Sequence, residues 1–298
     1  MAAPRVAHAP TPDTVAAFRS IDDAVRAGTG HEAVPEAVWR AVTQRPDDCL
    51  LALDEDGSVA ALTMPSDSFT PAYRQLAVAA KAGVATDAIA PVVEALLAAD
   101  AGTDFTAWLP GSDTAIEAAL TALGFRADRC QHQMRVPLPR PDAIRIPAGV
   151  ELRAFRPGTD DAAWLRVNNR AFENHPDQGG WVEEILPRRM AEPWFDPEGF
   201  LLAWRGEALA GFCWTKVHTA PEHLGEIFVI GVDPDAQGIG LGRALTLAGL
   251  DHLAVVRGCP TGVLYVAAAN APAVGLYESI GFEVHRTDTA LVLDRAGA

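Results

Sequence analysis

Residues 227–245 read Ile-Phe-Val-Ile-Gly-Val-Asp-Pro-Asp-Ala-Gln-Gly-Ile-Gly-Leu-Gly-Arg-Ala-Leu, and they carry the strongest local signal in the chain. The apolar, β-branched run predicts a buried strand over 226–232, and the apolar periodicity after the glycines predicts a helix over 240–256 that Gly258 ends. A glycine-rich loop between a strand and a helix points free backbone N–H groups outward at the positive end of the helix. The segment therefore predicts a site for an anion such as a pyrophosphate, with a glycine turn that binds nothing as the alternative.

Two other nucleotide-binding loops do not fit this segment. A P-loop has a Gly-Lys-Ser/Thr sequence, and no Lys follows the glycines here. A Rossmann fingerprint follows the first strand of its domain and has an acidic residue about 20 positions further on. Here the loop follows a late strand, and Thr261 stands at that distance. Both alternatives are set aside.

The rest of the second half predicts a mixed sheet with helices on its faces. Its apolar periodicity and turn signals predict strands over 150–155, 200–204, 209–217, 263–268 and 282–293, and helices over 161–171 and 271–279. The strands at 200–204 and 209–217 form a hairpin around residues 205–207. A hairpin followed by alternating strands and helices predicts an α+β fold with a mostly antiparallel sheet.

The two halves of the chain resemble each other in three places. Ala119–Phe125 matches Leu276–Phe282 and Gly83–Ala85 matches Gly240–Gly242 at the same offset of 157 residues, whereas Leu50–Ala52 matches Leu201–Ala203 at 151. An insertion near Pro221–Gly225 would explain the difference. Three matches in order at nearly constant spacing predict an internal duplication. Four prolines within Val136–Pro147 favour an extended connection. We therefore predict a first domain over 1–140, a linker over 141–150 and a second domain over 151–298.

Composition excludes several classes of function. Of 298 residues, 24 are Lys or Arg and 39 are Asp or Glu, so the net charge of −15 argues against nucleic-acid binding. The start of the chain lacks a signal-peptide pattern and no apolar run is long enough to span a bilayer, so we expect a cytoplasmic protein without a membrane partner. The four cysteines form no C-x-x-C pair, which predicts neither a disulfide framework nor a metal site. We expect a monomer.

The glycine loop resembles that of a known family. Gln237-x-x-Gly240-x-Gly242 is similar to the Q/R-x-x-G-x-G/A loop of the GNAT acetyltransferases, and Asn270, Tyr277 and Gly281-Phe282 follow in that family's order. The resemblance implies two tandem GNAT domains and acetyl-coenzyme A (acetyl-CoA) as co-substrate. The residues it assigns to acetyl-CoA are Ile230, Gly231, Val232, Gln237, Gly238, Ile239, Gly240, Leu241, Gly242, Arg243 and Asn270.

Further motifs resemble one group of tandem GNAT enzymes. They include Asn169-Arg-Ala-Phe, Trp194-Phe-Asp-Pro197, Gly211-Phe-x-Trp-Thr-Lys-Val-His218 and Leu264-Tyr-Val266. Enzymes of that group acetylate the cysteinyl amine of a cysteine–glucosamine–inositol pseudo-disaccharide, the last step in making the thiol cofactor mycothiol. The resemblance implies that Glu226 is the general base and Tyr277 the general acid. It implies further that this thiol-sugar acceptor is bound by Glu36, Asp177, Lys216, Glu226 and Tyr265.

Each of these roles has an ordinary alternative. Glu226 could be a solvated carboxylate at a strand end, Tyr277 a core residue, and Asp177, Lys216 and Tyr265 plain surface residues. His175, His218 and His223 lack metal-ligand spacing and are expected in loops. The first half has Ala80 in place of the leading Gln and Leu120 in place of Tyr277, so we expect it not to catalyse. Two other functions stay open: acetylation of another small amine, and sensing of acyl-CoA without turnover.

Overall fold

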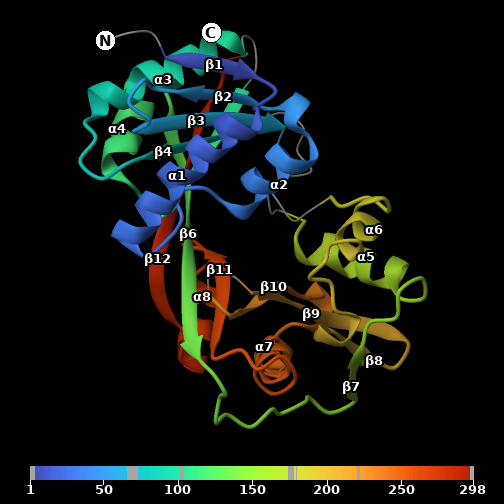
Figure 1. Cartoon of the computed structure of the whole chain (residues 1–298). Coiled ribbons are helices and arrows are strands. Elements are labelled where there is room, and N and C mark those ends of the chain that lie inside the picture. The colour runs from blue at the N-terminus through green and yellow to red at the C-terminus, as the bar shows by residue number, and fades with distance from the viewer. Residues whose placement is uncertain are drawn as a thin grey trace. The chain divides into compact units, whose positions relative to one another are not determined.

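The computed structural model describes residues 4–65, 73–100, 104–173, 178, 180–219 and 222–295. The chain divides into two compact units, the first made of residues 1–131 and 286–298 and the second of residues 132–285 (Figure 1). The end of the chain therefore belongs to the first unit. Two strands change unit along their length: β6 (Arg126–Pro137) and β12 (Glu283–Leu293).

The first unit is a mixed sheet with an apolar core on each face. Its strands follow the order β1 (Arg5–His8), β2 (Leu50–Leu53), β3 (Val59–Pro65), β4 (Tyr73–Ala80), β5 (Asp104–Leu109), and then the end of β12. Only the β4–β5 pair among these is parallel. Helices α1 (Pro12–Thr29) and α2 (Glu36–Gln44) cover one core, and α3 (Thr86–Ala99) and α4 (Thr114–Ala122) cover the other.

The second unit repeats this plan. Its strands follow the order β11 (Thr261–Ala267), β10 (Leu224–Val232), β9 (Ala208–His218), β8 (Phe200–Arg205), β7 (Val150–Ala154), and only β10 and β11 pair in parallel. Its helices are α5 (Asp161–Ala171), α6 (Ile185–Met190), α7 (Leu241–Asp251) and α8 (Ala271–Ile280). In Figure 1, β8, β9 and β10 lie side by side, with α7 on one side of them and α5 and α6 on the other. The predicted α+β class and mostly antiparallel sheet are confirmed.

Small residues let α7 approach the sheet closely. A Cβ atom on Gly249 would lie 2.6 Å from the Cys213 Sγ and 2.8 Å from the Ile227 Cδ1, closer than real Cβ contacts. The helix predicted over 240–256 is present, but its last turn, His252–Val256, is wound as a π-helix. Helix α8 ends at Gly281, whose φ of 101° only glycine adopts without strain. These features fix α7 and α8 against β9 and β10, where the predicted site lies.

The predicted duplication agrees with the order of elements, but the six-residue insertion lies elsewhere than expected. The last parallel pair is Leu76–Ala107 in the first unit and Ile227–Leu264 in the second, so the offset at Ile227 is still 151 residues. It reaches 157 at Gly240. The prediction of an insertion near Pro221–Gly225 is therefore wrong, because the extra residues lie between Ile227 and Gly240. The second unit has the longer connection from strand to helix.

The predicted first domain over 1–140 and second domain over 151–298 have other limits than these compact units, and they stay a prediction. The compact units change at residues 131/132 and 285/286, and the proline-rich residues 141–150 lie within the second unit. Across the described residues, every helix is too short or too polar to cross a bilayer.

Candidate active site

Strands β10 and β11 are paired along only part of their lengths. Their parallel ladder runs from Leu224–Thr261 to Ile227–Leu264, and both strands continue beyond it. The register of β10 against β9 shifts between Ile227 and Val229, which marks a β-bulge at this point. Within the described residues, the second half of β10 is therefore paired with β9 alone, and a gap separates it from β11.

Two backbone amides of β10 face this gap. The Asp233 N–H donates to the Ala210 carbonyl at 2.9 Å, which continues the β9–β10 ladder and makes Asp233–Ala210 a hydrogen-bonded pair. Pair types alternate along an antiparallel ladder, so Ile230 and Val232 occupy non-hydrogen-bonded pairs with β9. Their N–H and C=O groups point away from β9, toward the side where β11 diverges. The gap thus carries backbone donors and acceptors at the two positions that the sequence predicts.

The glycine loop follows directly and is open to solvent. The Asp233 carboxylate accepts from the Asp235 N–H at 3.0 Å and starts a short 3₁₀ turn, Pro234–Ala236. Residues 237–240 are all exposed. Gly240 is the N-cap of α7 with a φ of 84°, and no side chain caps this helix end. The first N–H groups of α7 are consequently free to bind an anion.

The other loop residues differ in what they can offer. Leu241 is 1% exposed and packs in the core, so only its backbone can reach a ligand. The Arg243 guanidinium donates to Asp142 at 2.9 Å and to the Ser279 Oγ at 3.0 Å. That side chain ties α7 to α8 and to the proline-rich segment.

Asn270 is the N-cap of α8. Its side-chain oxygen accepts from the Ala273 N–H at 3.3 Å. This capping role orients the side chain and leaves its amide hydrogens exposed at the start of α8.

Tyr277 lies on α8 in the apolar cluster that α7 and α8 form with the sheet. Its ring stacks edge-on against Phe282 with 5.8 Å between centroids. Burial, with a smaller effect from the Cys213 thiol, raises the pKa of Tyr277 to about 12. Cys213 stands opposite Ile230 in the β9–β10 ladder, which places the phenol near the start of the gap. The group is a phenol that stays protonated at neutral pH.

Glu226 and Lys216 share the opposite face of the sheet with Tyr265. Glu226 stands opposite Lys216 on β9 and opposite Val263 on β11. Paired residues on adjacent strands, and residues two apart on one strand, direct their side chains to the same face. Ile227 directs its side chain to the other face, into the cluster that contains Tyr277. The predicted base and the predicted acid therefore lie on opposite faces of the sheet, beside the gap.

Glu226 has a partner that sequence analysis missed. The carboxylate is buried, at 7% exposure, and its Oε2 lies 2.6 Å from the His218 Nε2. His218 was expected in a loop; that expectation is wrong, because His218 is the last residue of β9 and lies on the Glu226 face. The hairpin register brings the pair together, and no sequence motif gives that register. The alternative of a solvated carboxylate at a strand end does not fit this burial.

Lys216 is buried, and its Nζ lies 5.2 Å from the centre of the Trp194 ring. Trp194 in turn packs on Trp214 and Phe228, so an aromatic wall borders the Glu226 face. Such a position limits the directions in which the ammonium group can move.

Two predicted acceptor contacts, Asp177 and Glu36, are not tested by this arrangement. Asp177 is outside the described residues, as is His175. Glu36 is the exposed first residue of α2 and belongs to the first unit. Both assignments stay predictions.

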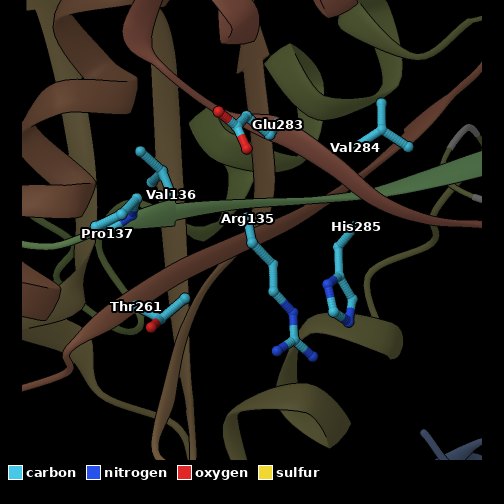
Figure 2. A pocket seen from close by; sticks show the side chains of 7 residues that line it. All are labelled: Arg135, Val136, Pro137, Thr261, Glu283, Val284 and His285. Atoms are coloured by element: carbon cyan, nitrogen blue, oxygen red, sulfur yellow. The ribbon is translucent and has the colours of Figure 1, made fainter. Parts of the chain in front are cut away.

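A cavity of about 230 Å³ lies between β6, β11 and β12 in the second unit (Figure 2). Its lining residues are Arg135, Val136, Pro137, Thr261, Glu283, Val284 and His285. None of the predicted site residues lines it. Among the described residues, no group of three or more His, Cys, Asp or Glu side chains could hold a metal ion.

Comparison with known proteins identifies the family. Residues 163–282 match the profile of the acetyltransferase (GNAT) family. A solved GCN5-related N-acetyltransferase from Sphaerobacter thermophilus has the same fold with a TM-score of 0.74 at 22% identity, covering 97% of this chain and 95% of its own. Residues 163–282 therefore belong to the GNAT family. A tandem GNAT protein from the clavulanic acid biosynthesis pathway matches with a TM-score of 0.70 at 17% identity, over 99% of this chain and 98% of its own.

Among curated relatives, this GNAT chain is similar to mycothiol acetyltransferases. That of Acidothermus cellulolyticus is 47% identical over 223 residues, which cover 69% of this chain and 66% of the relative. That of Thermomonospora curvata is 54% identical over 185 residues, 61% of each chain. The matched part thus spans somewhat less than two thirds of these relatives.

Proposed function

We propose that the chain transfers acetyl from acetyl-CoA to the cysteinyl amine of desacetylmycothiol, the cysteinyl-glucosaminyl-inositol acceptor. The observation that carries the proposal is the gap between β10 and β11, with outward amides at Ile230 and Val232, buried Glu226 on one face and Tyr277 on the other. The names of the similar curated proteins support the same acceptor.

The residues around the gap fit acetyl-CoA in charge and space. A pyrophosphate would be held by backbone N–H groups of the loop and the first turn of α7, residues 237–243, at the positive end of the helix. A Cβ atom on Gly238 or Gly240 would meet nothing within 4 Å, so open space lies beside these amides. The amides of Ile230 and Val232 would bind the pantetheine arm and the thioester oxygen, with Asn270 beside them. Acetyl-CoA supplies an activated acetyl group, and the chain supplies no covalent intermediate.

Glu226 would take the proton from the attacking amine. An α-amino group has an unperturbed pKa of about 7.7–8.0, so a carboxylate acting directly or through one water suffices as base. His218 holds one carboxylate oxygen, which orients the other. As the amine attacks, negative charge develops on the thioester oxygen, and a fixed backbone N–H in the gap stabilises it.

Tyr277 would donate its proton to the sulfur as the carbon–sulfur bond breaks. The phenol has its pKa raised to about 12 by burial, so it is protonated when the reaction begins. A thiolate that departs into the same apolar surroundings is also made more basic, because burial disfavours the charged form of any thiol. The transfer is complete when the proton of the amine has passed to Glu226 and the proton of the phenol has passed to the sulfur.

The acceptor would bind on the Glu226 face. Lys216 and Tyr265 present polar groups there, and the proposal keeps Asp177 and Glu36 as further contacts. A polyhydroxylated substrate needs several convergent hydrogen-bonding partners of this kind. We propose further that the enzyme works as a cytoplasmic monomer, without metal, nucleic acid or membrane partner.

The first unit would not catalyse. Leu120, which stands where the second unit has Tyr277, is fully buried in the α3–α4 core and has no proton to give. The first unit's connection from β4 to α3, residues 81–85, is also shorter than the connection from β10 to α7, residues 233–240, and offers fewer amides.

The test follows thiol release from acetyl-CoA with three separate acceptors: desacetylmycothiol, free cysteine and a panel of aminoglycosides. Product mass must be confirmed, because the first acceptor carries its own thiol. We expect strong preference for desacetylmycothiol. Preference for an aminoglycoside would support the other small-amine function. Acetyl-CoA binding without turnover on any acceptor would support a sensor.

Gly240→Ala tests the loop. An alanine at a φ of 84° is strained by about 1–2 kcal/mol. The backbone would relieve that strain by rotating, which would redirect the loop N–H groups away from the pyrophosphate. We expect the KM for acetyl-CoA to rise at least about fivefold, with the acceptor KM unchanged. Gly206→Ala is the matched control, since Gly206 also has a positive φ, 61°, and open space at its Cβ, but lies in the β8–β9 turn outside the loop. Equal kinetics in both variants would remove the loop from acetyl-CoA binding.

A further inference from the structure

Two carboxylates, Asp233 and Asp235, stand just before the glycine loop. Asp233 is buried and Asp235 is exposed, and the open part of the loop begins two residues later, at Gln237. A pyrophosphate held by the loop amides would therefore lie beside like charges, which repel it. The chain as a whole carries a net charge of −15, so long-range attraction does not offset this repulsion.

Arg170, near the end of α5, bridges these two carboxylates. Its Nη2 donates to the Asp235 Oδ2 at 2.8 Å and lies 3.2 Å from the Asp233 Oδ1. That same oxygen of Asp233 accepts from the Asp235 N–H. One guanidinium nitrogen thus joins both acidic side chains across the 3₁₀ turn that leads into the loop, and such charge-assisted bonds are stronger than neutral ones.

The helix that carries Arg170 is fixed on β10 next to this turn. A Cβ atom on Gly231 would lie 3.2 Å from the Ala171 Cβ, tighter than most real contacts, so a glycine at 231 lets α5 approach this closely. Ala171 directly follows Arg170, and Gly231 precedes Asp233 by two residues. The packing therefore places the guanidinium at the start of the loop.

We infer that Arg170 is a positioning residue for the co-substrate, whose guanidinium cancels the charge of Asp233 and Asp235 beside the bound pyrophosphate. The inference rests on the proposed function, in which residues 237–243 hold that pyrophosphate. Arg170 acts through the two carboxylates. It also gives a role to the motif Asn169-Arg-Ala-Phe, which the proposed catalytic steps do not use.

Arg170→Gln tests this role, because it removes the charge and keeps a hydrogen-bonding side chain. We expect the Kd for acetyl-CoA, measured by calorimetric titration, to be about tenfold above the parent's at an ionic strength of about 0.1 M. At about 1 M, where charges are screened beyond about 3 Å, the two Kd values should agree within about twofold. The kcat at saturating acetyl-CoA and the acceptor KM should not change. Arg166→Gln, an exposed arginine one turn earlier on α5, is the matched control for the lost charge.

A second substitution separates charge from structure. Asp235→Asn, added to Arg170→Gln, removes one of the uncompensated carboxylates without restoring the ion pair, so the Kd for acetyl-CoA should return to within about threefold of the parent's. An arginine that only holds the turn would give a loss that neither salt nor this substitution relieves. That result, or a Kd in Arg170→Gln equal to the parent's, would overturn the inference.

The proposed function fails in a different way. A parent enzyme that binds acetyl-CoA but leaves desacetylmycothiol unacetylated would refute the proposed acceptor, and the Kd values would still test Arg170. A parent that does not bind acetyl-CoA would overturn both. Thermal unfolding of each variant should stay close to the parent's, because exposed ion pairs contribute little to stability.

Discussion

Glu226→Gln is expected to lower kcat about 100-fold or more, because it removes the group that takes the amine proton. Glutamine has the same shape and still offers an oxygen or nitrogen to His218, which now lies 2.6 Å from the carboxylate. The side chain is on the face opposite α7 and α8, so the affinity for acetyl-CoA should not change. Steady-state kinetics with desacetylmycothiol and a calorimetric titration with acetyl-CoA measure the two quantities.

The pattern of these two results decides the role of Glu226. Loss of turnover with intact acetyl-CoA binding supports a base. A kcat equal to that of the parent would remove Glu226 from the mechanism and direct attention to His218 beside it. Loss of both turnover and acetyl-CoA binding would indicate that the buried carboxylate maintains the gap rather than moves a proton.

Tyr277→Phe should also lower kcat about 100-fold, for a different reason. The variant removes only the hydroxyl from a ring that packs on Phe282 in an apolar cluster, so the cluster keeps its volume. The sulfur then departs without a proton donor, into surroundings that disfavour a thiolate. The measurement is kcat at saturating acetyl-CoA, together with the free energy of unfolding in urea.

Tyr73→Phe is the matched control for Tyr277→Phe. Its phenol donates to Asp294 at 3.1 Å in the first unit, so its loss should leave kcat unchanged. An unchanged kcat in Tyr277→Phe would argue that water protonates the sulfur. A large fall in unfolding free energy would assign the phenol a structural role.

Much of the second unit could be predicted because its helices and strands are long and are bounded by glycines and turn residues. The helix expected over 161–171 has those same limits, and the hairpin and α8 are within a few residues of expectation. Helix α6 was missed, since Ile185–Met190 is too short for periodicity and contains Pro187. The β-bulge after Ile227 was also missed, because a register shift depends on the neighbouring strand and leaves no signal in one sequence.

The parts of the site that a sequence motif forms could be predicted. The parts that depend on the register between neighbouring strands could not. The Gln237–Gly242 loop has a sequence pattern that its backbone requires, shown by the positive φ of Gly240. His218 and Glu226 meet only because β9 and β10 align Lys216 with Glu226. Arg170 meets Asp235 through the packing of α5 on β10, 65 residues apart in the sequence, so no local spacing could indicate the contact.

The ends of β6 and β12 belong to the unit other than the one in which each strand begins. The segment that is repeated in the sequence is therefore not the same as the segment that forms one compact unit. Residues 289–293 of β12 pair with β5 in the first unit, and residues 132–137 of β6 belong to the second. A gene cut at the proline-rich segment would give a first fragment without the strand beside β5, and a second fragment without residues 132–137 of β6. Each fragment would expose an open sheet edge, which invites aggregation. Division of the chain into two separate single-domain proteins would carry that cost.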